Sequence, residues 1–417
     1  MLKKIRVEDV QLGMHIKEFC GSWMDHPFWR SQFVISDPKD LAKVKASKIT
    51  QVIIDIGKGL DVAPEAPTPP VPEEPETPEA TDIEEAVKYD RPVFSRIQKV
   101  SADKEFARAA AICKQATGAV ASMFQEARMG KAVNSEVAKA VVEDIAESVS
   151  RNGGALISLA RLKTADDYTY MHSVAVCALM VALARQLKMS DDEVRAAGFA
   201  GLLHDIGKMA VPLEVLNKPG KLTDEEFALI KKHPEEGVRL LHEGGVTDEA
   251  VIDVCLHHHE KTNGTGYPKG LDTTQISRLA KMGAVCDVYD AITSNRPYKA
   301  GWDPAQSLKQ MASWANGHFD PQIFQAFVSS LGIYPTGSLV LLDNNFLAVV
   351  VDQSPESLLK PQVKVFFSTR SGLRVKPEMV NLAHPSCKLK ILGREDPEKW
   401  KFPDLDELWS GAPQAKS

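Results

Sequence analysis

The chain has 417 residues, of which 44% are hydrophobic and 25% charged, as in an ordinary globular protein of two or three domains. Its net charge of −6 argues against non-specific DNA or RNA binding, which needs an excess of lysine and arginine. No apolar run approaches the roughly 18 residues of a membrane helix, and the N-terminus lacks a signal-peptide core. Six cysteines without a CxxC pair are typical of free thiols. We therefore expect a cytoplasmic protein without membrane insertion.

Residues 1–60 are expected to form a small α/β domain. The run Val52 to Ile56 is rich in β-forming residues and ends at glycines, and Pro38 to Lys48 has helical character. Residues 61–90 follow as a segment rich in proline and glutamate. Because this segment has almost no large apolar side chain, it cannot bury a core, and we expect a disordered linker.

Residues 91–334 are expected to form a helical domain. Apolar side chains recur there at a spacing of three to four residues, and several helix starts carry capping signals. The fold class predicted for the chain is therefore mainly α. The capping signals are Ser190 with Glu193, Thr223 with Glu226, Asp303-Pro304 and Asp320-Pro321.

Residues 335–417 are expected to form a small β-rich extension. Residues 338–342 and 346–351 flank Asp343-Asn344-Asn345 and predict a hairpin, and residues 363–367 predict a third strand. A turn is expected at Ser371-Gly372. The last residues are polar, and we expect a frayed tail.

Histidine and aspartate residues suited to a metal site are concentrated between residues 172 and 299. The pair His204-Asp205 lies in an expected helix of leucine, isoleucine and alanine, where an ionised aspartate needs a cation or several donors. Neighbouring helical residues point about 100° apart, so that one residue can bind one metal while the other bridges. Separate segments can thus surround two ions roughly 3.5–4 Å apart, as two-metal hydrolases require. The segments contain His172, His204-Asp205, His233, His257-His258-His259-Glu260 and Asp287.

Several ordered motifs over residues 160–332 resemble the signature of HD-GYP phosphodiesterases. The resemblance extends from the His-Asp pair through a Gly-Tyr-Pro loop to a later aspartate run, and Leu12-Gly13-Met14 resembles a small domain often found ahead of HD-GYP domains. The motifs are His204-Asp205 with Gly207 and Lys208, His258-His259-Glu260, Asn263-Gly264-Thr265-Gly266-Tyr267-Pro268, and the run from Asp287 to Lys299.

The resemblance implies a metal-dependent hydrolysis of cyclic di-GMP to linear pGpG, GMP or both. It implies two divalent metal ions, iron or manganese, which hold a bridging hydroxide, with Asp205 as the bridging carboxylate and Lys208 as a catalytic cation. The implied metal ligands are His172, His204, Asp205, His233, His258, His259 and Asp287. The implied substrate contacts are Lys208, Gly266, Tyr267, Pro268, Arg296 and Lys299.

The chain departs from the family pattern at a few positions. Tyr168 stands where some members have a glutamate that supports a third metal, so we expect two metals, with Asp166 or Asp167 as remote substitutes. Lys261 and Asn263 replace a common arginine and aspartate.

The sequence is compatible with more than one ligand register and more than one function. Because three histidines are consecutive, His257 could replace His258 or His259 as a ligand. The chain could be a non-catalytic protein that binds a cyclic dinucleotide, or binds a diguanylate cyclase domain through the Gly-Tyr-Pro loop. It could also be an HD hydrolase acting on another cyclic dinucleotide or nucleotide, and a homodimer is conceivable.

Overall fold

The computed structural model describes residues 2–20, 33–45, 51–60, 99–162, 168–218, 220–294 and 301–411. The chain divides into two compact units, Met1–Thr77 and Pro78–Ser417. The linker predicted over residues 61–90 lies outside the described residues. So do the phosphate-binding candidates Arg296 and Lys299, and Asp166 and Asp167.

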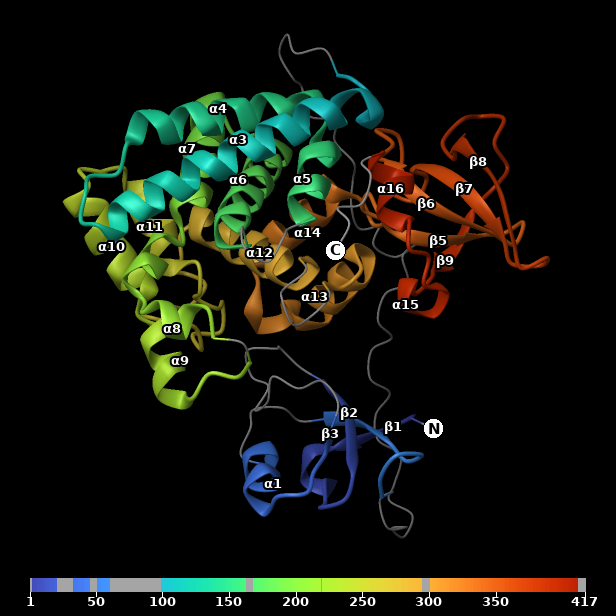
Figure 1. Ribbon diagram of the computed structural model, residues 1–417, viewed down its shortest axis with the longest axis horizontal. Coiled ribbons are helices and arrows are strands. Elements are labelled where there is room, and N and C mark those ends of the chain that lie inside the picture. The colour runs from blue at the N-terminus through green and yellow to red at the C-terminus, as the bar shows by residue number, and fades with distance from the viewer. Residues whose placement is uncertain are drawn as a thin grey trace. The chain divides into compact units, whose positions relative to one another are not determined.

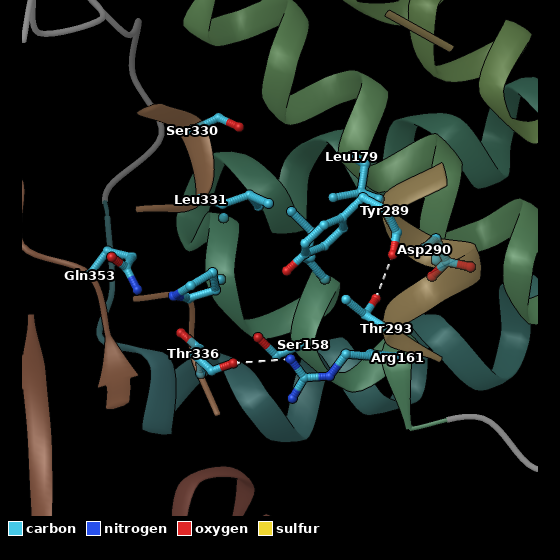
Figure 2. Close-up of a pocket in the computed structure, with 15 residues that line it drawn as sticks. Ser158, Arg161, Leu179, Tyr289, Asp290, Thr293, Ser330, Leu331, Thr336 and Gln353 are labelled. Carbon is cyan, nitrogen blue, oxygen red and sulfur yellow. Dashed lines mark hydrogen bonds between the residues drawn. The ribbon is translucent and has the colours of Figure 1, made fainter. Parts of the chain in front are cut away.

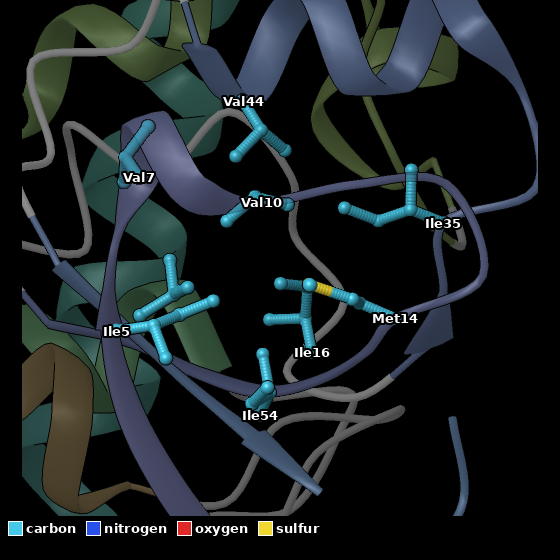
Figure 3. Packing of buried hydrophobic residues seen from close by; sticks show 9 residues of the cluster. Ile5, Val7, Val10, Met14, Ile16, Ile35, Val44 and Ile54 are labelled. Atoms are coloured by element: carbon cyan, nitrogen blue, oxygen red, sulfur yellow. The ribbon is translucent and has the colours of Figure 1, made fainter. Parts of the chain in front are cut away.

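The described residues of the N-terminal unit form a four-stranded antiparallel sheet in the order β1-β4-β2-β3 together with helix α1 and the short 3-10 helix η1. Strand β4 alternates between partly exposed and buried positions, and Val52 and Ile54 enter the core. Figure 3 shows Ile54 beside Ile5, Ile16 and other buried apolar side chains of this core. The small α/β fold predicted for this region is confirmed. Its elements are β1 (Leu2–Arg6), η1 (Val7–Asp9), β2 (His15–Cys20), β3 (Phe33–Val34), α1 (Pro38–Lys45) and β4 (Gln51–Asp55).

The larger unit begins with a body of helices, which confirms the mainly α fold class. Helix α6 is apolar on all sides, and α3, α4, α5, α7, α12 and α14 contact it (Figure 1). This central helix therefore carries His172, which follows its partly exposed first turn, into the protein interior. The helices are α3 (Ala102–Arg128), α4 (Ser135–Arg151), α5 (Gly153–Arg161), α6 (Tyr168–Gln186), α7 (Asp191–Leu203), η3 (Ile206–Ala210), α8 (Leu213–Leu216), α9 (Asp224–Ile230), α10 (His233–Glu243), α11 (Glu249–His257), α12 (Arg278–Thr293), α13 (Pro304–His318) and α14 (Pro321–Leu331).

The helix starts predicted from capping signals are confirmed. Both S/T-x-x-E signals form complete capping boxes, at Ser190 for α7 and at Thr223 for α9. Asp303 and Asp320 cap α13 and α14, each followed by proline in the first turn.

The expectation that His204-Asp205 lies inside a helix is wrong. Helix α7 ends at Leu203, and Asp205 has φ −103° and ψ 9° at the start of the 3-10 helix η3. The reason is a close approach between η3 and α10. A Cβ atom on Gly207 would lie 1.8 Å from the carbonyl oxygen of His233. This turn, and not a continuous helix, therefore sets the directions of the two side chains.

A five-stranded antiparallel sheet in the order β8-β7-β6-β5-β9 follows the helices. The predicted hairpin is β5-β6, with Leu341 opposite Leu347, and β7 covers the predicted third strand. Strands β8 and β9 were not predicted. Strand β8 is a largely exposed edge strand and lacks the apolar alternation of a half-buried strand. The strands are β5 (Leu339–Leu342), β6 (Phe346–Asp352), β7 (Gln362–Ser368), β8 (Leu373–Asn381) and β9 (Ile391–Arg394).

The frayed tail predicted for the last residues stays a prediction, because residues 412–417 lie outside the described part of the chain. The residues before them include two short helices, α15 (Pro397–Trp400) and α16 (Leu405–Ser410). Trp409 is only 2% exposed, and its ring centroid lies 5.8 Å from that of Phe106 in α3. One buried aromatic side chain thus holds a polar segment against the helices.

Among the described residues, no helix combines the length and apolar character needed to cross a bilayer. Five cysteines are free thiols, as predicted. They are Cys113, Cys177, Cys255, Cys286 and Cys387.

Candidate metal centre

Seven histidine and aspartate side chains from five segments meet in the interior of the helical body. Their nitrogen and oxygen atoms form three overlapping groups, and within each group all candidate ligand atoms lie within 4.8 Å of one another. All but one of the seven side chains belong to buried residues, and His259 is partly buried. The groups are His172 with His204 and Asp287, His204 with Asp205 and His258, and His233 with His258 and His259.

Asp205 lies between the two halves of this cluster. Its Oδ2 atom is 3.2 Å from Nε2 of His172 and 3.3 Å from Nε2 of His204. Its Oδ1 atom is 3.3 Å from Nε2 of His233 and 3.8 Å from Nε2 of His258. Each carboxylate oxygen therefore faces a different pair of imidazoles.

Asp287 is a second carboxylate shared by different imidazoles. Its Oδ1 atom is 3.1 Å from Nε2 of His172 and 3.9 Å from Nε2 of His204. Its Oδ2 atom is 3.7 Å from Nδ1 of His259. The structure thus brings all seven predicted ligand side chains into one cluster.

Backbone carbonyl groups orient three of the imidazoles. In each, Nδ1 lies within 3.0 Å of a carbonyl oxygen, which only accepts hydrogen bonds. Nδ1 must therefore carry the proton, and Nε2 keeps its lone pair for the cluster. The pairs are His204 with Gly201 at 2.8 Å, His233 with Ile230 at 2.7 Å, and His258 with Val254 at 3.0 Å.

The electrostatic environment favours neutral imidazoles on one side of the cluster. Burial lowers the pKa of His233 to about 4 and that of His258 to about 3. Burial also lowers the pKa of His259 well below its usual value. These side chains are therefore unprotonated near pH 7, as a metal ligand must be.

Negative charge collects on the other side of the cluster. Burial acts to lower the pKa of His172, but hydrogen bonds with Asp205, Asp287 and Asp290 outweigh it and raise the pKa to about 10, so that a cation here would displace a proton from this imidazole. Burial also acts to raise the pKa of Asp205, but the charge of Lys208 and the neighbouring imidazoles hold it well below the usual range. Ionised carboxylates in a buried site favour a cation between them.

Within the described segments, two buried atoms of the cluster lack hydrogen-bond partners, and this allows a test of whether a cation fits. They are Nε2 of His204 and Oδ1 of Asp205. Leaving such an atom unsatisfied costs about 1–3 kcal/mol. A metal ion would satisfy both, and the mixture of imidazole nitrogen and carboxylate oxygen suits iron, manganese or zinc. The residues present therefore fit divalent metal ions.

Asp290 orients His172 and was not predicted. Its Oδ2 atom lies 2.6 Å from Nδ1 of His172, and Ser294 donates a hydrogen bond to its Oδ1 atom at 3.2 Å. A carboxylate behind a ligand histidine fixes the ring and strengthens it as a ligand. The sequence signal was available, since Asp290 follows Asp287 by three residues on an apolar helix and so lies on a similar face.

We predict that Asp290→Asn weakens metal retention and turnover by about 10–100-fold, because the amide cannot stabilise the ligating imidazole as a carboxylate does. Elemental analysis after dialysis against a chelator measures the first effect. Ser294→Ala, which removes only a neutral hydrogen bond to the same carboxylate, is the matched control and should change little. Unchanged metal retention in Asp290→Asn would contradict an orienting role.

His257 faces away from the cluster. Its Nδ1 atom is 2.9 Å from Oδ1 of Asp253, and it belongs to none of the metal-suited groups among the described residues. The sequence left open which of the three consecutive histidines are ligands. The structure brings His258 and His259, which directly follow α11, to the cluster.

The Gly-Tyr-Pro loop is fastened beside the cluster by Glu260. This buried carboxylate accepts backbone hydrogen bonds from Lys269 at 2.7 Å, Gly270 at 3.1 Å and Leu271 at 3.0 Å. Gly266 approaches closely, since a Cβ atom there would lie 2.4 Å from Cα of Glu260. Glu260 was predicted only as part of a motif, without this role.

Tyr267 of the loop covers one imidazole of the cluster. Its ring stacks on His259 with centroids 4.6 Å apart and an interplanar angle of 26°. The ammonium group of the exposed Lys231 lies 5.3 Å from the Tyr267 centroid and 4.9 Å from that of Phe227. Lys208, whose side chain is 23% exposed, pairs with Asp205. The cluster thus has lysine side chains that reach solvent and an aromatic loop beside it.

Comparisons with known proteins agree with this geometry. Residues 2–138 match a domain of unknown function, DUF3391, and residues 141–323 match the HD domain. The chain is 51% identical to a cyclic di-GMP phosphodiesterase of Pseudomonas aeruginosa over 412 aligned residues. The aligned region covers 99% of this chain and 96% of that protein. The chain belongs to the HD-GYP family. HD-GYP proteins are metal-dependent phosphodiesterases, and this chain is an enzyme of that class.

Two further relatives match a shorter part of this chain. The response regulator RpfG of Xanthomonas campestris, a cyclic di-GMP phosphodiesterase, is 40% identical over 149 residues, 35% of this chain and 39% of that protein. The 3′3′-cGAMP-specific phosphodiesterase 3 of Vibrio cholerae is 33% identical over 168 residues, 40% of this chain and 36% of that protein. HD-GYP relatives thus include enzymes named for different cyclic dinucleotides.

Proposed function

We propose that this HD-GYP enzyme hydrolyses cyclic di-GMP to linear pGpG, GMP or both, with two divalent cations, iron or manganese. The observation that carries the proposal is the position of Asp205, whose two oxygens face different pairs of imidazoles. One carboxylate can therefore bridge two cations. Asp205 would be shared, with His172, His204 and Asp287 on one cation and His233, His258 and His259 on the other.

When bound, such a cation pair supplies a hydroxide at neutral pH and neutralises charge on the phosphoryl oxygens. The chain's own residues hold and orient the reacting groups. Lys208, paired with Asp205 and partly exposed, brings a positive charge to the edge of the cluster. Charge that develops on a phosphoryl oxygen there is stabilised by this ammonium group. Arg296 and Lys299 are proposed to hold phosphate as well.

The loop residues Gly266, Tyr267 and Pro268 are proposed to contact the substrate. The stacking of Tyr267 on His259 and the backbone hydrogen bonds to Glu260 support this role, since they hold the loop beside the cluster. The same loop is a proposed contact for diguanylate cyclase domains, and a homodimer is a further proposal.

We predict that Lys231→Ala raises KM for cyclic di-GMP about tenfold and leaves kcat almost unchanged. The ammonium group near Tyr267 lies outside the ligand cluster, so it acts on the binding of an anionic substrate. Steady-state kinetics measure the effect. Lys232→Ala removes the neighbouring exposed lysine and is the matched control. Equal KM values in the two variants would contradict a contact between Lys231 and the substrate.

The decisive experiment is anaerobic preparation of the protein with iron or manganese, followed by elemental analysis and chromatography of the products from cyclic di-GMP. We expect about two metal ions per chain and conversion to pGpG or GMP. A parallel reaction with 3′3′-cGAMP separates the two substrates. Metal-loaded protein that leaves cyclic di-GMP intact would overturn the proposed substrate, and turnover of 3′3′-cGAMP alone would replace it.

A further inference from the structure

A small cavity lies apart from the ligand cluster, between α5, α12 and the segment that leads into the C-terminal sheet (Figure 2). Its volume is about 30 Å³, whereas a buried water needs roughly 10–15 Å³ by the same kind of measure. The space therefore suits a group of a few heavy atoms and excludes a nucleotide. Its polar lining includes Ser158, Arg161, Tyr289, Asp290, Thr336 and Gln353.

Arg161 brings a positive charge to this cavity without an ion pair among the described residues. Its Nη1 atom donates to the Thr336 carbonyl at 3.4 Å, and its guanidinium carbon lies 5.6 Å from the Trp409 ring centroid. Asp303, which interacts electrostatically with Arg161, is already paired with Arg394 at 2.9 Å. A partly buried guanidinium group without an ion pair among the described residues favours an added anion.

Two buried hydroxyl groups complete a set of donors. Oγ1 of Thr336, a residue only 3% exposed, has no hydrogen-bond partner in the described part of the chain. Tyr289 is also 3% exposed, and Figure 2 shows its hydroxyl pointing into the cavity. A tyrosine hydroxyl at this position can donate a hydrogen bond to an acceptor in the cavity. An unpartnered hydroxyl and a guanidinium in one cavity match the acceptors of an oxoanion.

We propose that this cavity binds a small oxoanion, a carboxylate or phosphate group, held by Arg161, Tyr289 and Thr336. Asp290 lines the cavity, and its carboxylate is engaged with His172 and Ser294. The anion therefore lies next to the residue that orients a ligand histidine. Binding at the cavity does not depend on which dinucleotide the enzyme hydrolyses.

The test is thermal unfolding of the metal-loaded protein in rising concentrations of acetate or inorganic phosphate, with chloride keeping the ionic strength constant. We expect a saturable rise in Tm, because a ligand that binds only the folded state stabilises it. Arg161→Met should weaken this binding at least about tenfold, equivalent to the loss of about one good charge-assisted hydrogen bond. Arg108→Met, at an arginine whose side chain is 62% exposed, is the matched control and should bind as the unmodified protein does.

The two anions separate the sources of the oxoanion, since a carboxylate site prefers acetate and a phosphate site prefers inorganic phosphate. If Arg161→Met does not fold, Thr336→Val carries the same comparison, because it removes the unpartnered hydroxyl and keeps the side-chain shape. A Tm response that is absent, or the same in the folded variant as in the control, would overturn the proposal. Inhibition of turnover by the same anions gives a second measurement. If an anion inhibits only by competing with substrate, and equally in Arg161→Met and the unmodified protein, it binds at the metal centre and not in the cavity, and the proposal is overturned.

Discussion

Replacing Asp205 by asparagine is expected to lower turnover of the metal-loaded enzyme by at least about a thousandfold, or roughly 4 kcal/mol of transition-state stabilisation. The carboxylate has one oxygen 3.2 Å from His172 and the other 3.3 Å from His233. Asparagine has a single acceptor oxygen and no charge, so it cannot face both sides as a ligand. The number of metal ions per chain should also fall, and elemental analysis together with initial rates measures both effects.

A matched control exists on a neighbouring helix. Asp253→Asn makes the same chemical change at a carboxylate that pairs with His257 and Ser277, outside the cluster. It should retain metal and nearly full turnover. If Asp205→Asn kept two metal ions and turned over substrate like Asp253→Asn, the central position of Asp205 would have no catalytic meaning.

The second large effect is expected from Gly207→Ala, a change of one methyl group. The added Cβ atom would lie 1.8 Å from the carbonyl oxygen of His233 and 2.4 Å from the backbone nitrogen of Gly237. Both are backbone atoms that no side-chain rotation can move away. We expect a loss of about 3 kcal/mol in stability, and a displaced α10 would also carry His233 out of the cluster. Thermal unfolding and metal content report these two consequences.

Gly118→Ala tests the same substitution where space is available. Gly118 is exposed in the middle of α3, and a Cβ atom there meets nothing within 4 Å. Alanine restricts the unfolded chain and suits a helix, so we expect a gain of about 0.5–1 kcal/mol. Similar Tm values for the two alanine variants would contradict the close approach between η3 and α10.

Much of the candidate site could be predicted because its residues lie in ordered local motifs. His204-Asp205, His258-His259-Glu260 and the run after Asp287 keep the spacing of a known family, so a distant resemblance pointed to them. The structure brings the predicted side chains together, and their role as ligands stays a prediction that the experiments above test. Arg296 and Lys299 lie outside the described residues, so their placement remains a prediction too.

Positioning residues were harder to predict, because they act across elements. The spacing of Asp290 from Asp287 puts both on a similar face of α12, but nothing in the sequence says that Asp290 lies behind His172, 118 positions earlier. Nor does the sequence say that Glu260 accepts three backbone hydrogen bonds from the loop that follows it. Such contacts depend on how helices pack and on how a loop turns back. The same holds for Lys231 beside Tyr267, which no local pattern marks.

The sequence by itself determined the mainly helical class, the helix starts at Ser190 and Thr223, and the set of imidazoles and carboxylates, since periodicity, capping and ligand chemistry are properties of local residue types. Only the tertiary structure decided that α7 ends at Leu203, that His257 points away from the cluster, and that Trp409 packs against α3. Those outcomes depend on long-range packing. The contact of Gly207 with α10 is an example. The backbone atoms that Gly207 approaches belong to His233 and Gly237, which lie well beyond the end of α7 in the sequence.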